Sequence, residues 1–451
     1  MMKLEVKTIS KQTIQPSSPT PPHLKTFHLS LLDQLIPPPY APLILFYPNS
    51  QHGVVSSSSR LDVLKSSLSE TLTRFYPLAG TLSSDDLTID CDDRGANFVE
   101  ARADCTITRF LTQPDLLSLP NLLPVDPAGP IVEPRHVSNF QVTEFACGGI
   151  AIGICISHKM LDGAALGTFL KAWTATAAVE EEKETSRMLI NPVFVAGTLF
   201  PAGGSHWLRD ASMPMWGSFF RKGKCVTRRI VFNSPAIQSL KSRSNSPATR
   251  VEIVSALLWK SIMAVTQKPS VLTHMVNLRN RIDPNLCRNA LGNLLWISSA
   301  KHDPKTEYPS GSSGLGELAG KVRESISKID GGFVGRLMSG AEREAAMAET
   351  FDGIVEMKMK EGADFVGVSS WCRLGFYGSD FGWGKPVWVS SYGLEGSVFL
   401  NLVMMADTPC GEGVEAWVTM DEEEMAAVAR NEEMLEFAKF DPSPLVNFTS
   451  G

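Results

Sequence analysis

The residues best suited to chemistry lie in the segment His158-Lys159-Met160-Leu161-Asp162-Gly163. A histidine side chain has a pKa near neutrality, so its imidazole can take a proton from a hydroxyl group while that oxygen attacks a carbonyl carbon. A general base of this kind typically accelerates a reaction by about 10²–10⁴-fold. The pattern H-x-x-x-D also fits a buried structural histidine beside a helix cap, and the segment alone leaves both interpretations open.

A second unusual string, Asp380-Phe381-Gly382-Trp383-Gly384, lies near the end of the chain. Two glycines flank a tryptophan, so the backbone is expected to turn tightly around a large aromatic ring. We interpret this string as a structural turn that supports the site from outside it. The chain has no G-x-S-x-G nucleophile elbow. It also has no C-x-x-C pair, which argues against a zinc or thioredoxin-like site, and we predict no bound metal.

The elements on either side of His158 are predicted to place it at a strand-to-helix junction. Residues 141–157 form an apolar run that is typical of a buried strand. Its β-branched face consists of Ile150, Ile152, Ile154 and Ile156, and its small face of Gly149, Ala151, Gly153 and Cys155. Such a small face indicates that a neighbouring layer approaches closely. A helix over 163–178 should follow, with Asp162 as its N-cap.

The remaining pattern alternates strands and helices in both halves of the chain, which predicts an α/β fold with two mixed domains. Periodicity predicts helices over 60–75, 251–266, 315–329, 341–359 and 421–438, and strands over 43–47, 271–278, 365–370, 386–391, 397–405 and 413–419. The acidic run at 180–184 and a stretch rich in Gly and Pro interrupt this pattern. We therefore expect an N-terminal domain over 1–190, a crossover connection over 191–217 and a C-terminal domain over 218–451.

Composition narrows the class of partner. The 451 residues are 43% hydrophobic and 20% charged, with a net charge of −6. An acidic chain is a poor match for nucleic acid or an anionic membrane as its main partner. The sequence shows no signal-peptide pattern and no apolar run of the roughly 18 residues that a membrane span needs. The 8 cysteines are scattered, so we expect free thiols, a reducing compartment and a cytoplasmic protein.

The two motifs occur together with three further segments, Tyr76-Pro77-Leu78-Ala79-Gly80, Asn277-Leu278-Arg279-Asn280-Arg281 and Gly292-Asn293. In this combination the sequence resembles the BAHD family of plant acyl-CoA-dependent acyltransferases over nearly its whole length. The resemblance implies two mixed-sheet domains of chloramphenicol-acetyltransferase-like architecture. It implies an active-site channel between them and a part of 365–390 that packs back on the N-terminal domain.

The resemblance also implies roles for the motif residues. His158 would deprotonate the acceptor hydroxyl, and Gly163 would support its loop. Asp162 would turn away from the substrates and pair with Arg279. Asp380 would hold the D-F-G-W-G turn at some distance from the reaction.

Three further residues are assigned by the same resemblance. Trp383 would help to shape the site. Ser255 and Lys260, in the segment similar to the family's cofactor-side helix, would contact coenzyme A. Cys372 stands where some relatives have a threonine thought to assist the oxyanion, so that assistance is not expected here.

The substrates implied are an acyl-CoA donor and a small-molecule alcohol, with no permanently bound cofactor and a monomeric enzyme. The Leu43–Asn49 run and Trp371-Cys372-Arg373 resemble the clade of alkaloid and alcohol acetyltransferases, which favours acetyl-CoA. The Y-F-G-N-C motif of anthocyanin acyltransferases is replaced by Ala290-Leu291-Gly292-Asn293-Leu294. The expected acceptor is a plant specialised metabolite: an alkaloid, a terpenoid, a phenolic or a simple alcohol.

Two alternatives stay open at the level of sequence. A condensation-type acyltransferase takes its donor from a carrier protein, but such enzymes usually have two adjacent histidines, whereas Ser157 precedes His158 here. A non-catalytic homologue that only binds a small molecule is the other alternative. The intact His158, Asp162 and Asp380 motifs favour an enzyme over this binding protein.

Overall fold

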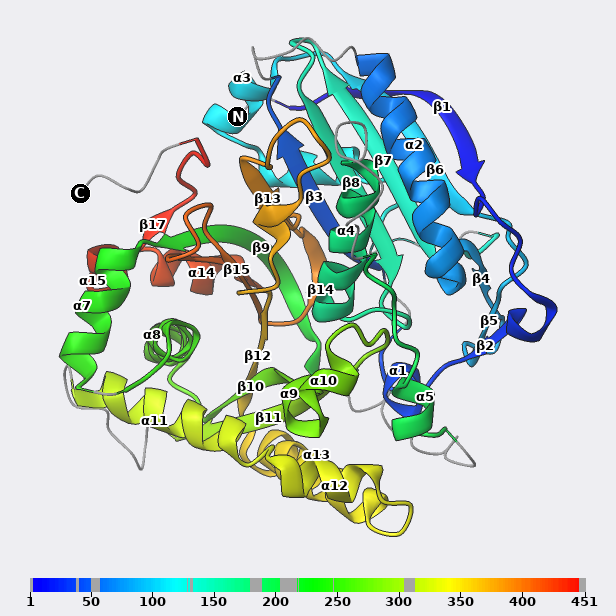
Figure 1. Ribbon diagram of the computed structural model, residues 1–451. Coiled ribbons are helices and arrows are strands. Elements are labelled where there is room, and N and C mark those ends of the chain that lie inside the picture. The colour runs from blue at the N-terminus through cyan, green and yellow to red at the C-terminus, as the bar shows by residue number, and fades with distance from the viewer. Residues whose placement is uncertain are drawn as a thin grey trace.

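The computed structural model confirms an α/β fold built on two mixed sheets, each covered by helices (Figure 1). It describes residues 3–37, 40–49, 57–127, 129, 133–178, 189–202, 217, 219–245, 247–303 and 313–445. The acidic run at 180–184 and residues 203–216 of the predicted connection lie outside this described part. None of the described helices combines the length and the hydrophobicity needed to cross a bilayer.

The N-terminal sheet has six strands in the order β1 (Val6–Ile14), β6 (Ala96–Ala103), β7 (Ser138–Phe145), β8 (Ile150–Ser157), β3 (Tyr40–Tyr47) and β13 (Trp388–Ser390). Helices α2 (Ser57–Arg74) and α4 (Gly163–Ala177) pack side by side over one face (Figure 1). Their leucines and aromatic rings form a core with the isoleucines of β8. The opposite face packs against α3 (Ile107–Thr112) and η3 (Leu116–Leu122).

The apolar run at 141–157 is two strands rather than the single strand predicted. Gly148, in the left-handed region with φ +77°, turns the chain between β7 and β8, and the amide of Phe145 donates to the carbonyl of Gly149 at 2.8 Å. The two strands then pair antiparallel. Strands β7 and β8 are buried on both faces along nearly their whole length. Because the sequence shows no polar break at the turn between them, the turn was not predicted.

The small face predicted for β8 is present. A Cβ atom added at Gly153 would lie 2.0 Å from the carbonyl oxygen of Leu122 in η3, a separation that only glycine allows. The isoleucines of β8 point to the other side, into the core beneath α2 and α4. The strand that leads to His158 is therefore fixed from both faces.

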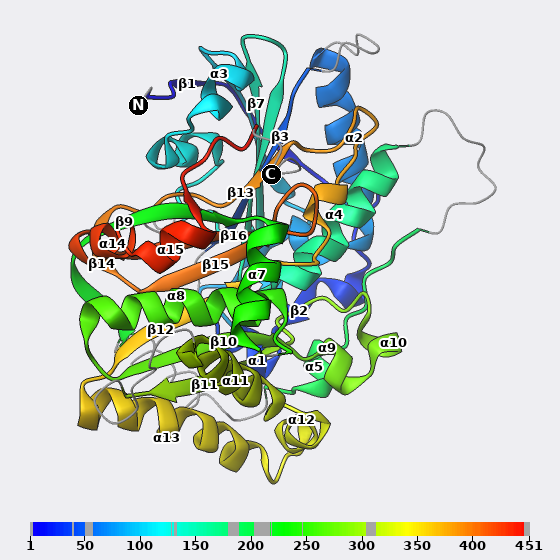
Figure 2. The same ribbon diagram turned by 90° about the vertical axis from the view of Figure 1, so that its left-hand side faces the viewer.

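The C-terminal sheet follows the order β11 (Leu295–His302), β10 (Ser270–Asn277), β12 (Asp364–Ser370), β15 (Leu402–Asp407), β16 (Val414–Asp421), β9 (Arg221–Phe232) and β14 (Gly396–Phe399), with β17 (Lys439–Phe440) beside β9. Helix α8 (Arg250–Thr266) lies across it, as Figure 2 shows. Helices α7 (Ser234–Ser244), α11 (Ser313–Ser327), α14 (Glu422–Val428) and α15 (Glu432–Phe437) join α8 in one core. The predicted helices at 251–266, 315–329 and 341–359 correspond to α8, α11 and α13 (Arg343–Glu361).

Two predictions in this half are corrected, and one helix was missed. The strand expected over 397–405 is divided into β14 and β15, and the helix expected over 421–438 into α14 and α15. The helix divides because Asn431 caps a new one, accepting a hydrogen bond from the amide of Met434 at 3.0 Å. Helix α12 (Gly331–Met338) was not predicted. The shorter elements are α1 (Leu31–Gln34), α5 (Ala196–Leu199), α9 (Arg279–Ile282), α10 (Pro284–Cys287), η1 (Pro22–Leu24), η2 (Tyr76–Ala79), η4 (Phe376–Gly378) and the small sheet β2 (Thr26–His28), β5 (Thr88–Asp90), β4 (Thr81–Leu82).

A segment of the C-terminal half completes the N-terminal sheet. Strand β13 pairs antiparallel with β3, so that Trp388 lies opposite Phe46. Strand β12, only a short distance earlier in the chain, pairs with β10 and β15 in the C-terminal sheet. The chain between β12 and β13 therefore passes from one sheet to the other, along the edge where the two domains meet (Figure 1).

Candidate active site

His158 lies at the junction where β8 ends and α4 begins. The amide of Met160 donates to the carbonyl of Ser157 at 2.9 Å, which closes a tight turn around the histidine. Asp162 then caps α4, because its Oδ1 accepts from the amide of Ala165 at 2.9 Å. The imidazole is half-buried, whereas Met160 and Leu161 are buried beneath it.

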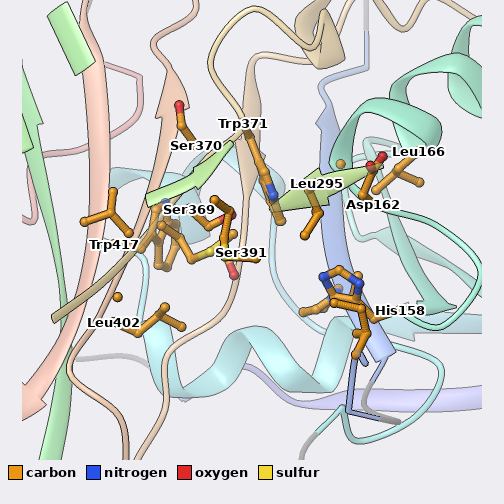
Figure 3. A pocket seen from close by; sticks show the side chains of 18 of the residues that line it. His158, Asp162, Leu166, Leu295, Ser369, Ser370, Trp371, Ser391, Leu402 and Trp417 are labelled. Carbon is orange, nitrogen blue, oxygen red and sulfur yellow. The ribbon is translucent and has the colours of Figure 1, made fainter. Parts of the chain in front are cut away.

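The imidazole borders a cavity of about 380 Å³ between the two sheets. In Figure 3, His158 lies on one side of this cavity, Trp417 and Leu402 lie on the other, and Trp371 points into it from above. The lining is mostly apolar, with hydroxyl groups from Ser369, Ser370, Ser391, Thr227, Thr273 and Thr419. Among the described residues that line it, Asp162 is the only aspartate, glutamate, lysine or arginine.

The carboxylate of Asp162 serves the fold rather than the cavity. Its Oδ2 pairs with Nη1 of Arg279 at 2.7 Å, and both side chains are buried. Arg279 also donates to the carbonyls of Ala290 and Gly292 at 3.0 and 3.1 Å, and the amide of Leu294 donates to the same carboxylate at 3.0 Å. Figure 3 shows Asp162 turned from the imidazole toward Leu166. The predicted pairing of Asp162 with Arg279 is thus present in the structure.

The tautomer of His158 follows from its contact with Asn293. The Nδ2 of Asn293 donates to the carbonyl of His158 at 2.7 Å and to Oδ1 of Asp33 at 2.9 Å. Both partners accept hydrogen bonds, so the amide orientation is assigned from the network, and the amide oxygen must face Nδ1 of His158, 3.1 Å away. That oxygen only accepts, so Nδ1 carries the hydrogen and Nε2 keeps the basic lone pair.

Sequence reasoning assigned no role to Asn293 or to Asp33. Asp33 is 1% exposed and belongs to a capping box with Ser30 at the start of α1. Burial raises the pKa of the Asp33 carboxyl, while hydrogen bonds from Ser30 and Asn293 lower it. One signal was available: an aspartate within the apolar stretch Leu29–Leu35, three residues after a serine, has the spacing of a capping box.

The Asp380 turn has the form that the glycines predict. Oδ1 of Asp380 accepts from the amides of Gly382 and Gly384, each at 2.9 Å. Both glycines lie in the left-handed region, with φ +101° and +103°. Phe381 is buried against Trp173 of α4, with 4.8 Å between ring centroids. The turn therefore docks on the N-terminal domain and does not line the cavity.

Three residues assigned by resemblance are not brought to the cavity. Trp383 stacks on Phe381, 5.6 Å between centroids, and lies beneath the guanidinium of Arg60. Ser255 is fully buried inside the core of α8, and Lys260 pairs with Glu433 at 2.8 Å. None of the three lines the described cavity. The contacts of Ser255 and Lys260 with coenzyme A stay predictions.

Gly163 lines the cavity and has a steric reason to be glycine. An added Cβ would lie 2.8 Å from Cδ1 of Leu374 and 3.2 Å from Cδ1 of Trp371. The first turn of α4 therefore allows these two side chains of the C-terminal half to approach closely. Nearby Cys372 does not line the cavity, and burial raises the pKa of its thiol to about 11, which disfavours a nucleophilic thiolate.

Comparison with known proteins identifies the family. The model of the Transferase family, which describes the BAHD acyltransferases, matches residues 4–435. The chain belongs to the BAHD family. This acyltransferase is 38% identical to epi-neemfruitin B 7-O-acetyltransferase from Melia azedarach, over 98% of this chain and 100% of that one. It is 34% identical to stemmadenine O-acetyltransferase from Catharanthus roseus, over 95% and 97% of the two chains.

The solved structures agree with the fold. The crystal structure of vinorine synthase superposes with a TM-score of 0.80 at 31% identity, covering 96% of this BAHD chain and 99% of that one. The structure of TRI101 from F. sporotrichioides complexed with coenzyme A and T-2 superposes with a TM-score of 0.68 at 17% identity, covering 92% and 99%. The predicted enzyme class is confirmed: the protein is an acyl-CoA-dependent O-acyltransferase, with acyl-CoA as its co-substrate.

Proposed function

We propose that this enzyme transfers an acetyl group from acetyl-CoA to a hydroxyl group of a neutral, polycyclic terpenoid, with His158 as the general base. The observation that carries the proposal is the cavity between the two sheets, where the imidazole of His158 is presented to a mostly apolar lining. The relatives support the acetyl donor, since those described above are named O-acetyltransferases.

The charge of the lining supports a neutral acceptor. Asp162 is the only lining aspartate, glutamate, lysine or arginine in the described part of the chain, and Arg279 neutralises it. A protonated amine held in this cavity would lose its hydration without gaining a counter-charge, which is costly. The relative named limonoid 7-O-acetyltransferase shares 38% identity with this chain, stemmadenine O-acetyltransferase 34% and limonoid 1-O-acetyltransferase 32%. The uncharged lining, rather than sequence identity, therefore carries the choice of a neutral acceptor.

The proposed reaction is a single transfer in a ternary complex. Nε2 of His158 takes the proton of the acceptor hydroxyl while the oxygen attacks the thioester carbonyl. The tetrahedral oxyanion collapses, the carbon–sulfur bond breaks, and the leaving thiolate takes the proton back from the imidazolium. No covalent acyl-enzyme forms, so initial-rate plots should intersect. Parallel double-reciprocal lines would contradict this order of events.

A donor and acceptor screen tests the proposal. The purified enzyme is incubated with acetyl-, malonyl-, benzoyl- or coumaroyl-CoA and with hydroxylated acceptors in matched pairs, a neutral polycycle and a protonated amine of similar size. We expect the mass increase of one acetyl group, on the neutral member of each pair, and no product with His158→Ala. Product with a carrier-protein thioester alone would favour condensation-type chemistry. Equal background transfer by wild type and His158→Ala would favour a binding protein.

We further propose that the enzyme acts as a monomer in the cytosol. The acidic composition and scattered thiols of the sequence favour this location. Light scattering at assay concentration and fractionation of plant cells that express a tagged chain test the two parts separately. A stable dimer, or residence in an organelle, would contradict them.

A further inference from the structure

Three residues from distant parts of the chain meet behind the imidazole. Asp33 comes from α1, His158 from the end of β8, and Asn293 from the loop before β11. The order of contact is Asp33 Oδ1 to Asn293 Nδ2 at 2.9 Å, then Asn293 Oδ1 to His158 Nδ1 at 3.1 Å. The amide of Asn293 therefore separates the carboxylate from the imidazole and is polarised by both.

Burial raises the pKa of the Asp33 carboxyl, and four donated hydrogen bonds oppose that rise by favouring the ionised form. Oδ1 accepts from the backbone amide and the side-chain amide of Asn293, at 2.6 and 2.9 Å. Oδ2 accepts from the backbone amide and the hydroxyl of Ser30, at 2.9 and 2.6 Å. All four contacts are donated to the carboxylate, and hydrogen bonds of this kind favour the charged form. The side chain is buried, so its charge acts at short range through little solvent.

We propose that Asp33 is a positioning residue for His158, acting through Asn293. Its carboxylate holds the Asn293 amide so that the carbonyl oxygen faces Nδ1, which leaves Nε2 free to take the proton. Its negative charge also stabilises the imidazolium as it forms, because the polarised amide carries that charge toward the ring. The inference rests on the proposed role of His158 as general base.

A merely structural role makes a different prediction. Asp33 joins the N-terminal domain to the loop that carries Asn293, so its loss could lower stability without touching the chemistry. In that case kcat per folded enzyme would not change, or would fall by the same factor whether Asn293 was present or not. A positioning role requires that the effect of Asp33 on kcat vanish when Asn293 is removed.

The experiment is a double-mutant cycle with Asp33→Asn, Asn293→Ala and the combined variant. Asn293→Ala is a clean partner because the backbone amide of residue 293 still donates to Asp33. Loss of the outer hydrogen-bond partner of a metal-binding histidine typically costs about 10–100-fold, and we take the same range for the partner of His158. We expect each single change to lower kcat by about that factor with the KM values for donor and acceptor little changed, and the combined variant to match Asn293→Ala. Additive losses, or unchanged kcat in Asp33→Asn, would overturn the proposal.

Asp364→Asn is the matched control, since it neutralises another buried aspartate, at the start of β12, that has no contact with His158. It can lower the melting temperature, but kcat per folded enzyme should stay at the wild-type value. If Asp33→Asn does not fold, Ser30→Ala replaces it in the cycle, because it removes the hydroxyl donor to Oδ2. We then expect a smaller fall in kcat that again vanishes with Asn293→Ala; a fall that persists would overturn the proposal.

A spectroscopic measurement separates this inference from the enzyme's proposed function. Nitrogen-15 spectra of histidine-labelled protein, assigned to His158 by difference from His158→Ala, report which ring nitrogen carries the hydrogen. We expect the Nδ1–H form in the wild type and a mixture with Nε2–H in Asp33→Asn and Asn293→Ala. This result holds whether or not the assayed acceptor is the right one. A wild-type ring with the hydrogen on Nε2, or the same tautomer in all variants, would contradict the positioning role.

Discussion

His158 and Asp162 belong to one motif but have different partners. The imidazole faces the cavity and the amide of Asn293, whereas the carboxylate faces Arg279 and the first turn of α4. Asp162 thereby fixes the loop on which His158 stands. Substitutions at the two positions should consequently fail in different ways.

We predict that His158→Ala reduces turnover by at least about 10²–10⁴-fold, the typical contribution of a general base, and leaves the melting temperature nearly unchanged. The imidazole is half-buried, and the bond from Asn293 to the backbone carbonyl of residue 158 remains. Steady-state rates and thermal unfolding measure the two effects. His23→Ala, at an exposed histidine, is the control and should keep full activity. A His158→Ala enzyme with wild-type kcat would exclude the general-base role.

For Asp162→Ala we predict a loss of about 3–5 kcal/mol in the free energy of unfolding, because Arg279 would remain buried without its counter-charge. Activity should fall together with stability, since α4 loses its N-cap and the loop that carries His158 is no longer held in place. Urea unfolding followed by tryptophan fluorescence measures the change. Glu422→Ala breaks the exposed pair with Lys224 and should cost no more than about 1 kcal/mol. An Asp162→Ala protein as stable as wild type would refute the structural role.

At the scale of elements, β8 and α4 fix the position of the base through close packing, in addition to the polar contacts of Asp162 and Asn293. Gly153 lets β8 approach the carbonyl of Leu122, and Gly163 lets α4 approach Trp371 and Leu374. The Asp380 turn rests on α4 through Phe381. The junction that carries His158 is thus held by neighbours on several sides.

We predict that Gly153→Ala destabilises the protein by about 1–3 kcal/mol, the usual cost of overpacking a well-packed core. The new methyl group would meet a backbone carbonyl at 2.0 Å, and a backbone atom cannot move aside as a side chain does. Gly335→Ala, on the exposed side of α12 with no atom near the added methyl, should instead be neutral or stabilising by up to about 1 kcal/mol. Equal stabilities of the two variants in urea would disprove the close-approach argument.

At the scale of the whole molecule, one buried group ties the two sheets together. Glu415 of β16 pairs with Arg229 at 2.8 Å, and both are almost fully buried. The same carboxylate accepts from the indole of Trp388 in the N-terminal sheet at 3.1 Å and from that of Trp417 at 3.0 Å. Trp417 lines the cavity, so the Glu415 carboxylate that connects the two sheets also orients a side chain of the site.

We predict that Glu415→Ala lowers the free energy of unfolding by about 3–5 kcal/mol, because Arg229 is left buried without its partner. Two indole N–H groups also lose their acceptor. The KM for the acceptor should rise more than kcat falls, since Trp417 is freed while His158 is untouched. Calorimetry and acceptor titration measure this pair of effects. An unchanged melting temperature would contradict the role of Glu415 in holding the two sheets together.

We predict that the buried His274 makes the free energy of unfolding depend on pH. Burial lowers the pKa of this histidine from its ordinary 6.5 to about 4. Between these values the unfolded chain binds a proton that the folded protein does not, so the stability that is present above pH 6.5 is lost as the pH falls toward 4. The slope is at most about 1.4 kcal/mol per pH unit. Urea unfolding at pH 5 and 7.5 should show a smaller difference for His274→Leu than for wild type, and equal differences would refute this assignment.

Local patterns in the sequence determined much of the fold and part of the site. The strand-to-helix junction at His158, the Asp162 cap, the helices α2, α8 and α11, and the Asp380 turn all follow from residues a few positions apart. Periodicity and capping are properties of neighbouring residues, because a helix or a strand repeats over two to four positions. Periodicity and capping can therefore be recognised in a single sequence. The charge and composition likewise limited the class of partner.

Tertiary structure alone decided the features that join distant residues. The contact of Asn293 with His158 spans 135 positions and that with Asp33 spans 260. No local pattern of residues predicts contacts over such separations. The same holds for the carboxylate of Glu415 between Trp388 and Trp417. The return of part of 365–390 to the N-terminal domain was expected from the family resemblance, and the structure supplied its register, with β13 paired to β3. Each depends on which surfaces pack together when the two sheets meet. The sequence thus determined which residue could act as the base, and packing decided which of its nitrogens is basic.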